Sequence, residues 1–357
     1  MRLPVFALLA ALAAPLAMSA AKPTIAFVGL RHSHCWRQLQ NVKDRADAIE
    51  LVGIAESIPE LVAEAKKLHP GQYFTDDYKL LVEERKPDIV WAFVENNRHL
   101  EILEYMAPLG IHVIFEKPLA SNYAEAKKMQ ALAKKYGVEV MTNYQMAWWP
   151  TNQEIKRQAD AGAVGDIWRM HGIVGHGGPG SEGPRSKYFF AWLTDPVKNG
   201  AGALVDFGCY NAIWALWIKG RPQSVYAQVE HLQPQRFPKV EDSSLMVLDY
   251  PDGVGIFEGS WDLPRSFQDL ELFGREGSLH MNRDAVTLRK GRRGEAETVK
   301  ETPLPEARLD PLLYIADVVA NHKQVDNIMA IDINAAAVEI LDAAKQSIAT
   351  GKPVKLQ

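Results

Sequence analysis

Residues 24–29 read Thr-Ile-Ala-Phe-Val-Gly, and residues 51–56 read Leu-Val-Gly-Ile-Ala-Glu. Neither run alternates apolar with polar residues, which is typical of strands buried on both faces of a sheet. Similar runs alternate with amphipathic segments as far as residue 147. The expected strands cover 24–29, 51–55, 88–94, 112–115 and 139–142, and the expected helices cover 35–42, 59–68, 99–109 and 125–136. This alternation predicts an α/β domain built on a parallel, doubly wound sheet.

The pattern changes in the second half of the chain, where short strands follow one another with turn residues between them. Sequential strands of this kind favour an open, mostly antiparallel sheet. The expected strands cover 167–174, 224–230, 244–250, 254–261, 269–273 and 286–289, a loop rich in glycine and proline covers 175–184, and the expected helices cover 152–161, 206–217, 311–321 and 334–349. We therefore expect a first domain over residues 22–147 and an α+β domain over residues 148–357.

The first 21 residues are predicted to be a signal peptide. Arg2 precedes an uncharged apolar run, residues 3–17, and small residues follow it, as in secretory signals. The run is shorter than the ~20 residues needed to span a bilayer. We expect cleavage after Ala21 and an exported mature chain that begins at Lys22, with no attachment to a membrane.

The overall composition argues against two other classes of protein. Lys and Arg total 40 and Asp and Glu total 44, and the resulting formal charge of -4 gives no basic surface for nucleic acid. The two cysteines, Cys35 and Cys209, cannot provide a disulfide framework, so we expect two unpaired thiols.

The turn after the first strand departs from the usual dinucleotide fingerprint. Dinucleotides bind where a strand turns tightly into a helix, because backbone N–H groups and the helix dipole then meet the pyrophosphate. The usual pattern is G-x-G-x-x-G, whereas residues 29–34 read Gly-Leu-Arg-His-Ser-His. Either Arg31 contacts phosphate as a cation, or the fold has lost its dinucleotide. The residues expected to contact the dinucleotide here are Gly29, Arg31, His32, Ser33 and His34.

Three further segments resemble the Gfo/Idh/MocA family of dehydrogenases. They are Glu116-Lys117-Pro118, residues 202–210 (Gly-Ala-Leu-Val-Asp-Phe-Gly-Cys-Tyr) and the ending 349–354 (Ala-Thr-Gly-Lys-Pro-Val). The resemblance extends over essentially the whole mature chain. It implies a Rossmann domain that binds NAD or NADP, followed by a substrate domain whose open sheet commonly forms homo-oligomers.

Several polar residues follow strands of the first domain, at the carboxyl edge where ligands bind. Glu56 ends the second strand, where a carboxylate binds ribose hydroxyls and repels a 2′-phosphate, so we expect NAD rather than NADP. Asn96 and His99 follow the strand at 88–94, and the resemblance places this turn along the cofactor. It also places Glu116 at the cofactor and Lys117 between the nicotinamide and the substrate hydroxyl.

Asp206 and Tyr210 complete the predicted catalytic group with Lys117. They are four positions apart and so share one helical face. Oxidation of a carbinol requires its proton to leave as the hydride leaves. A phenol with a pKa of ~10 is a poor base unless a cation lowers that pKa, and Lys117 could supply the charge. The alternatives are a core aromatic for Tyr210 and a helix N-cap for Asp206.

Residues 174–179 (Val-Gly-His-Gly-Gly-Pro) resemble the Gly-Gly-His-Gly-Gly motif of the family's NAD-dependent α-N-acetylgalactosaminidases. In those enzymes transient oxidation at C3 acidifies the C2 proton, the leaving group is eliminated, water adds and the hydride returns. A histidine in this frame, His176, is suited to protonate the leaving oxygen. The alternative is a histidine with no role beyond its glycine-rich turn.

Two other groups of residues have weaker interpretations. Trp148, Trp149 and Trp192 could form a wall on which a sugar stacks, although tryptophan more often packs in a core. The spacing of His32, His34 and Cys35 suggests a metal, but no fourth ligand is evident, so we predict no metal site.

The sequence therefore favours an NAD(P)-dependent oxidoreductase that acts on a sugar or sugar-like substrate by hydride transfer. Two alternatives stay open: a redox-neutral glycosidase that recycles its own NAD, and a non-catalytic ligand-binding module. Export would separate the protein from cytoplasmic NAD, so we expect a tightly bound cofactor that is regenerated in each turnover.

Overall fold

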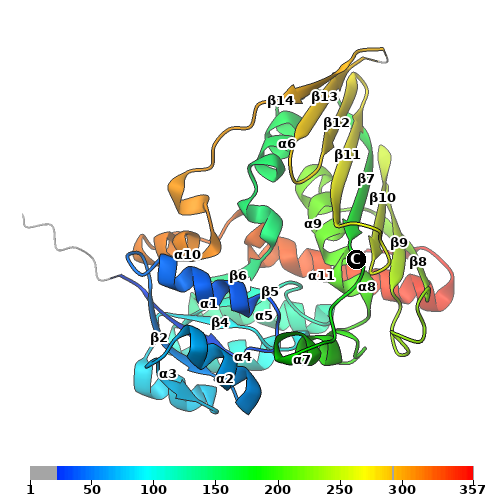
Figure 1. The fold of residues 1–357 in the computed structure, drawn as a ribbon. Coiled ribbons are helices and arrows are strands. Elements are labelled where there is room, and N and C mark those ends of the chain that lie inside the picture. The colour runs from blue at the N-terminus through cyan, green and yellow to red at the C-terminus, as the bar shows by residue number, and fades with distance from the viewer. Residues whose placement is uncertain (1–21, 292, 357) are drawn as a thin grey trace, which may run out of the picture.

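The structure is a computed structural model that describes residues 22–291 and 293–356 (Figure 1). The predicted signal peptide, residues 1–21, lies outside these ranges. Among the helices of the described ranges, none has the length and apolar character to cross a bilayer.

The first domain is built on a six-stranded sheet in which all neighbouring strands run parallel. Its strands are β1 (Thr24–Val28), β2 (Glu50–Ala55), β3 (Phe74–Thr75), β4 (Ile89–Ala92), β5 (His112–Glu116) and β6 (Val140–Asn143). Their order is β3-β2-β1-β4-β5-β6, so the direction of winding reverses between β1 and β4. In such sheets ligands bind beyond the carboxyl ends of the strands at this junction.

Helices cover both faces of this sheet because its strands point apolar side chains both ways. They are α1 (Cys35–Asp44), α2 (Pro59–Leu68), α3 (Tyr78–Arg85), α4 (His99–Met106) and α5 (Tyr123–Tyr136). Ile25 and Phe27 of β1 share a core with α1 and α2, whereas Ala26 and Val28 share a second core with α3, α4 and α5. The predicted doubly wound sheet is therefore confirmed.

The second domain is a nine-stranded sheet in the order β14-β13-β12-β11-β7-β10-β9-β8-β15. Its strands are β7 (Ile167–Gly175), β8 (Ser224–Glu230), β9 (Ser243–Tyr250), β10 (Gly253–Ser260), β11 (Phe267–Gly274), β12 (Gly277–Met281), β13 (Val286–Lys290), β14 (Ala296–Val299) and β15 (Val354–Lys355). β7 and β10 run parallel, and the other described neighbours run antiparallel. The open, mostly antiparallel sheet of the prediction is confirmed.

One face of the second sheet is covered by helices. The helices of this domain are α6 (Pro150–Asp160), α7 (Pro184–Leu193), α8 (Ala203–Asp206), α9 (Gly208–Lys219), α10 (Pro311–Ala320) and α11 (Ile331–Thr350). Short 3-10 turns are η1 (Asn96–Arg98), η2 (Ala107–Leu109), η3 (Gln145–Trp148), η4 (Glu306–Arg308) and η5 (Asn327–Met329). α6, α9 and α11 contact strands of the sheet, while the strands alternate buried with partly exposed residues, as expected of a sheet covered on one side.

The long helix α11 connects the two domains. It contacts α5 and β6 of the first domain and α9 and β8 of the second, and Figure 1 shows it running across the junction of the two sheets. The carboxyl edge of the parallel sheet therefore faces the segments that precede α9, and residues from both domains meet there.

The elements α3, β3, β12, β14 and β15 were not predicted, and two further details also differ from the prediction. The helix expected over 206–217 begins at Gly208, because the chain breaks at Phe207 after the short helix α8. The glycine- and proline-rich loop is followed by α7, which was not predicted, although Pro184 at its first position is a common helix start. α7 lies beside α2 of the first domain and therefore spans the junction between the domains.

Candidate active site

The centre of the candidate site is a buried ion pair between the domains. Lys117 follows β5 and precedes a cis peptide bond to Pro118. Its Nζ donates to the main-chain oxygen of Asp206 at 3.1 Å and to the carboxylate Oδ1. Both side chains are almost fully buried. Burial alone would lower the pKa of Lys117, but the carboxylate outweighs this effect and raises it, so the ammonium stays charged.

One further side-chain contact and the fixed start of α8 hold Asp206 in place. Its Oδ2 accepts from the indole N–H of Trp261 at 2.8 Å, and Trp261 is fully buried. The start of α8 is fixed by Glu241, which accepts from the N–H groups of Gly202 and Leu204 at 2.7 and 3.0 Å. Burial would raise the pKa of Asp206, but Lys117 and the indole lower it below its ordinary value. Asp206 is therefore a carboxylate aimed at Lys117, and the N-cap interpretation does not describe it.

Tyr210 lies beside this pair, with its ring centroid 5.2 Å from the Nζ of Lys117. It is buried and packs edge-on against Tyr144 at 5.2 Å. The expectation that Lys117 lowers the pKa of Tyr210 is wrong. Burial raises the pKa of Tyr210, and the opposing effect of Lys117 is too small to reverse the shift. Tyr210 is thus a neutral phenol next to an ammonium, and in this state it can donate a hydrogen bond but cannot act as a base.

His176 reaches the same region from the end of β7. Its ring packs edge-on against Phe207 at 5.1 Å, and its Nδ1 accepts from the N–H of Gly178 at 3.0 Å. Gly178 has a φ of 86°, a left-handed conformation that favours glycine. Burial lowers the pKa of His176, and the nearby Lys117 adds to this while Asp206 opposes it. His176 is therefore neutral at neutral pH.

The loop after β1 keeps a tight turn at its one remaining glycine. Gly29 has a φ of 78°, and a Cβ at this position would lie 2.7 Å from Val94. The N–H of Leu30 donates to Glu56 at 2.7 Å, and Arg31 forms an ion pair with Glu95 at 2.7 Å. Arg31 therefore lies along the carboxyl edge of the sheet, and its charge is already paired.

Glu56 lies where the sequence predicted it, at the end of β2. A cavity beside it at the carboxyl ends of β1 and β2 is lined by Gly29, Arg31, Ser57 and Tyr78, among others. One oxygen of Glu56 accepts from Leu30 and the other from the N–H of Ile58 at 2.8 Å.

The turn after β4 carries polar atoms that have no hydrogen-bond partner in the described structure. The side-chain oxygens of Asn96 and Asn97 are both buried and unpartnered. The amide nitrogen of Asn96 donates to Oδ1 of Asn199 at 2.8 Å, a residue of the second domain. Leaving a buried polar atom unpaired costs free energy, and Nε2 of His99 in the same region is also unpartnered.

His99 has a structural position, although it was predicted to contact the cofactor. It is fully buried, its ring stacks on Phe115 at 4.6 Å, and its Nδ1 contacts the main-chain oxygen of Leu119 at 3.0 Å. Burial lowers its pKa to about 4, which keeps it neutral.

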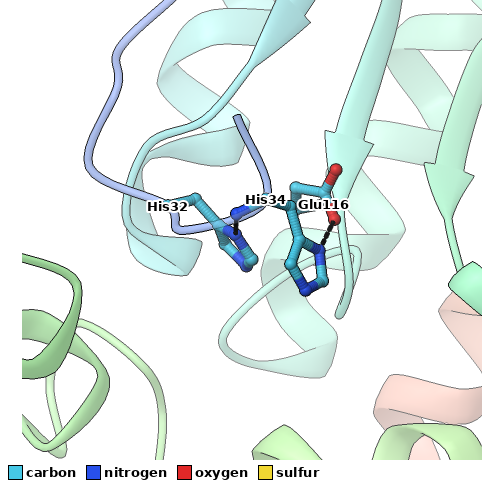
Figure 2. Close-up of side chains that lie close together, drawn as sticks. All are labelled: His32, His34 and Glu116. Carbon is cyan, nitrogen blue, oxygen red and sulfur yellow. Dashed lines mark hydrogen bonds and ion pairs between the residues drawn. The ribbon is translucent and has the colours of Figure 1, made fainter. Parts of the chain in front are cut away.

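The other predicted loop residues gather around the end of β5 (Figure 2). Nδ1 of His34 lies 2.7 Å from Glu116, whose other oxygen accepts from Asn143 at 2.9 Å. His32 is buried, its Nδ1 accepts from the N–H of His34 at 3.2 Å, and its pKa is well below the ordinary value because of burial. Ser33 and His34 line a cleft on the α1 side of the loop.

α7 lies over this loop from the second domain. The indole N–H of Trp192 donates to the main-chain oxygen of Arg31 at 3.3 Å, and the rings of Phe189 and Trp192 pack against His32 at 4.9 and 5.6 Å. Lys187 forms an ion pair with Glu60 of α2 at 2.5 Å. Trp192 is buried in this packing and belongs to no stacking wall, whereas Trp148 and Trp149 line the cleft with Ser33 and His34.

The structure brings together Lys117, Asp206, Tyr210 and His176, as the sequence predicted. Trp261 and Asn199 were missed, because nothing near them in the sequence links them to residues so far away in the chain. Cys35 and Cys209 are both buried and free, which confirms two unpaired thiols.

The first domain is a parallel sheet with a glycine turn at the point where its winding reverses, and a second domain covers this edge. These features are typical of a two-domain dinucleotide-binding protein. Family models agree with this class. Residues 24–144 match the oxidoreductase family with an NAD-binding Rossmann fold, and residues 152–280 match the GFO/IDH/MocA C-terminal domain. The chain belongs to the Gfo/Idh/MocA family.

Curated relatives include levoglucosan dehydrogenase of Pseudarthrobacter phenanthrenivorans, which is 28% identical over 64% of this chain and 64% of that protein. D-glucoside 3-dehydrogenase of Escherichia coli is 25% identical over 63% of this chain and 58% of that protein. The chain therefore matches less than two thirds of either relative. Aldose-aldose oxidoreductase from Caulobacter crescentus, solved with glycerol, has the same fold, with a TM-score of 0.80, 20% identity, and coverage of 94% of this chain and 100% of that one.

Proposed function

We propose that this protein is an oxidoreductase that transfers a hydride between a nicotinamide dinucleotide and a carbinol carbon of a sugar or sugar-like substrate. The observation that carries the proposal is the buried Lys117–Asp206 pair beside Tyr210, at the carboxyl edge of the Rossmann sheet. A buried ammonium costs free energy unless it is paired, and such groups cluster at functional sites.

The residues at this edge fit a dinucleotide. Gly29 allows the turn after β1 to pack against Val94, and we propose that the unpartnered oxygens of Asn96 and Asn97 accept from ribose hydroxyls or a carboxamide. Glu56 stands beside the cavity at the end of β2, and its charge favours NAD over NADP. When bound, the nicotinamide ring supplies or accepts the hydride.

The side chains of Lys117, Tyr210 and Asp206 have separate roles in this reaction. Lys117 donates a hydrogen bond to the reacting oxygen and stabilises negative charge that develops on it. Tyr210, held as a neutral phenol, gives its proton to that oxygen when a carbonyl is reduced and becomes a phenolate, and the reverse reaction, oxidation of a carbinol, starts from this phenolate, which takes the proton back. Asp206 keeps Lys117 charged and in position.

The position of α7 supports a tightly held cofactor. Because Trp192 and Phe189 close over the loop that meets the pyrophosphate, the dinucleotide would leave only after α7 moves. A retained cofactor must be restored within each cycle, either by a second sugar or by return of the hydride to the same molecule. Two relatives are named for the oxidation of sugars or glycosides, which supports a carbohydrate substrate.

A redox-neutral glycosidase is a second candidate because His176 lies beside Phe207, next to the Lys117–Asp206 pair. In this mechanism His176 would protonate the leaving oxygen. Its lowered pKa makes it a stronger acid when protonated, but leaves little of that form at neutral pH. The oxidoreductase therefore remains the first proposal.

One experiment separates the candidates. The purified protein is denatured and the released nucleotide is identified by mass spectrometry, and the native protein is then given chromogenic hexosaminides and free sugars without added NAD. Reduced nicotinamide formed from free sugars supports the oxidoreductase, and chromophore release without net reduction supports the glycosidase. Absence of both nucleotide and turnover leaves only a ligand-binding module.

We also propose that the protein is exported and forms homo-oligomers through its open sheet. The apolar N-terminal segment supports export. The half-exposed face of the nine-stranded sheet offers a surface for a second copy. Mass photometry of the mature protein tests the second point, because a mass of one chain at micromolar concentration would contradict it.

A further inference from the structure

Two histidines and a glutamate meet beside the loop that follows β1. His32 and His34 come from the loop, and Glu116 ends β5 (Figure 2). Each residue offers one ligand atom, and these three atoms lie within 4.8 Å of one another. Their nearness depends on the chain fold, because Glu116 is 82 positions beyond His34.

We propose that His32, His34 and Glu116 form a binding site for a divalent transition-metal ion of the zinc class. Two imidazoles and a carboxylate are a donor set that Zn²⁺ and its neighbours in the first transition row accept, whereas Mg²⁺ and Ca²⁺ prefer oxygen donors alone. The sequence alone did not predict this site, since only the histidine pair was visible. Cys35, the neighbour that the spacing suggested, is buried and its Sγ donates to the main-chain oxygen of Leu30 at 3.4 Å, so it takes no part.

The distances suit an ion that replaces a proton. Nδ1 of His34 and Oε2 of Glu116 are 2.7 Å apart, which is a hydrogen-bond distance. Ligand atoms at ~2.1 Å from a tetrahedral zinc are about 3.4 Å apart, so this pair must separate by less than 1 Å. His32 must approach from at most 4.8 Å to the same spacing.

The surroundings contain the outer partners that metal-binding residues usually have. Asn143 donates to the second oxygen of Glu116 at 2.9 Å and fixes the carboxylate. The amide of Gln145 lies 3.2 Å from Nε2 of His34, and an amide turned over there would accept the N–H of a metal-bound imidazole.

His32 gives an independent indication of a ligand. It is 1% exposed, yet its Nε2 forms no hydrogen bond with any residue that the structure describes, and its Nδ1 accepts only the 3.2 Å contact from the loop. A buried imidazole nitrogen without a hydrogen-bond partner costs free energy unless a ligand binds it. Three protein ligands would leave a coordination position for water or for an oxygen of a bound molecule.

The test measures metal binding itself and does not depend on activity. The full chain is stripped with a chelator, titrated with Co²⁺ and then Zn²⁺, and followed by the visible absorption of bound Co²⁺ and by metal analysis after gel filtration. We expect about one ion per chain and Zn²⁺ displacing Co²⁺. His32→Gln and His34→Gln should each weaken binding by about 10- to 100-fold or more.

A matched control is His171→Ala, which removes an exposed histidine that pairs with Glu258 at 3.0 Å on the second sheet. It should bind metal as the parent chain does. His32→Gln leaves the His34–Glu116 contact in place, and a thermal melt checks that the variant folds. Zn²⁺ should raise the melting temperature of the parent and the control, but not that of His32→Gln. The proposal is overturned if the parent chain binds no stoichiometric metal, or if His32→Gln and His34→Gln bind it as tightly as His171→Ala.

Discussion

Replacing Asp206 with asparagine should destabilise the protein strongly, because it leaves the ammonium of Lys117 buried without its partner. The side chains of Lys117 and Asp206 are 5% and 7% exposed, and no carboxylate other than Asp206 hydrogen-bonds Lys117 in the described structure. Removal of one member of a buried pair costs about 3–5 kcal/mol. That loss corresponds to a decrease of roughly two to four orders of magnitude in the folding equilibrium constant.

Equilibrium urea unfolding, followed by tryptophan fluorescence, measures this loss. The control is Asp252→Asn, which removes the partner of Lys219 from a pair whose carboxylate is 70% exposed. Exposed pairs contribute about 0–1 kcal/mol, so this variant should differ little from the parent. The double variant Lys117→Met/Asp206→Leu should regain much of the lost stability, because apolar replacement removes both buried charges.

The stability lost in Asp206→Asn should depend on pH in a direction that follows from the pKa of Lys117. In the parent chain the folded pKa of Lys117 is raised, so the pair contributes its stability below the ordinary lysine pKa of 10.5 and loses it as pH rises through the folded value. In Asp206→Asn burial is the largest remaining influence and lowers the pKa of Lys117, so the deficit should shrink as pH rises toward about 10. The role of the buried pair is refuted if Asp206→Asn loses no more unfolding free energy than Asp252→Asn, or if its loss does not change with pH.

Three further predictions concern other parts of the molecule. Burial lowers the pKa of His99 from 6.5 to about 4, so the unfolded state binds more protons than the folded state between these pH values. The free energy of unfolding should therefore fall by about 3 kcal/mol as the pH drops from 6.5 to 4. His99→Gln should reduce this pH dependence, and an unchanged pH dependence would contradict the assignment. Trp192→Ala should release bound dinucleotide during gel filtration while the parent retains it, since the substitution opens the cover over the loop; equal retention would argue against a role for α7. Expression in a secreting bacterial host should yield a mature chain whose N-terminal residue is Lys22, and a retained Met1 in the exported fraction would exclude cleavage after Ala21.

Most of the first domain could be predicted from the sequence because its central strands bury both faces, whereas the short, half-buried β3 and the helix α3 were not predicted. The apolar runs of β1 and β4 have no competing interpretation, and Asn122 and Gly137 mark the ends of α5 as an N-cap and a left-handed C-cap. The second domain was predicted less fully. The break at Phe207 and the helix α7 depend on contacts with distant residues, namely Glu241 for the start of α8 and α2 for α7.

In the candidate site, too, local motifs could be recognised in the sequence, whereas contacts between distant residues could not. Local motifs identified Lys117, Asp206 and Tyr210, because each lies in a segment with a recognisable pattern. The pKa of Tyr210 could not be predicted, since it depends on how deeply Tyr144 and the surrounding core bury the ring. The closeness of Glu116 to His34 was also invisible, because only the folded sheet brings the end of β5 to the loop after β1.

The most direct test of the account is a single-turnover experiment on protein that retains its dinucleotide. Sugars are mixed with the protein in the absence of added cofactor, and the absorbance of reduced nicotinamide is followed. The account predicts growth of about one equivalent per chain with the correct sugar, and at least a hundredfold slower growth in a Lys117→Met variant that still holds the nucleotide. Reduction at the parental rate in that variant would contradict the role of Lys117 at the reacting oxygen.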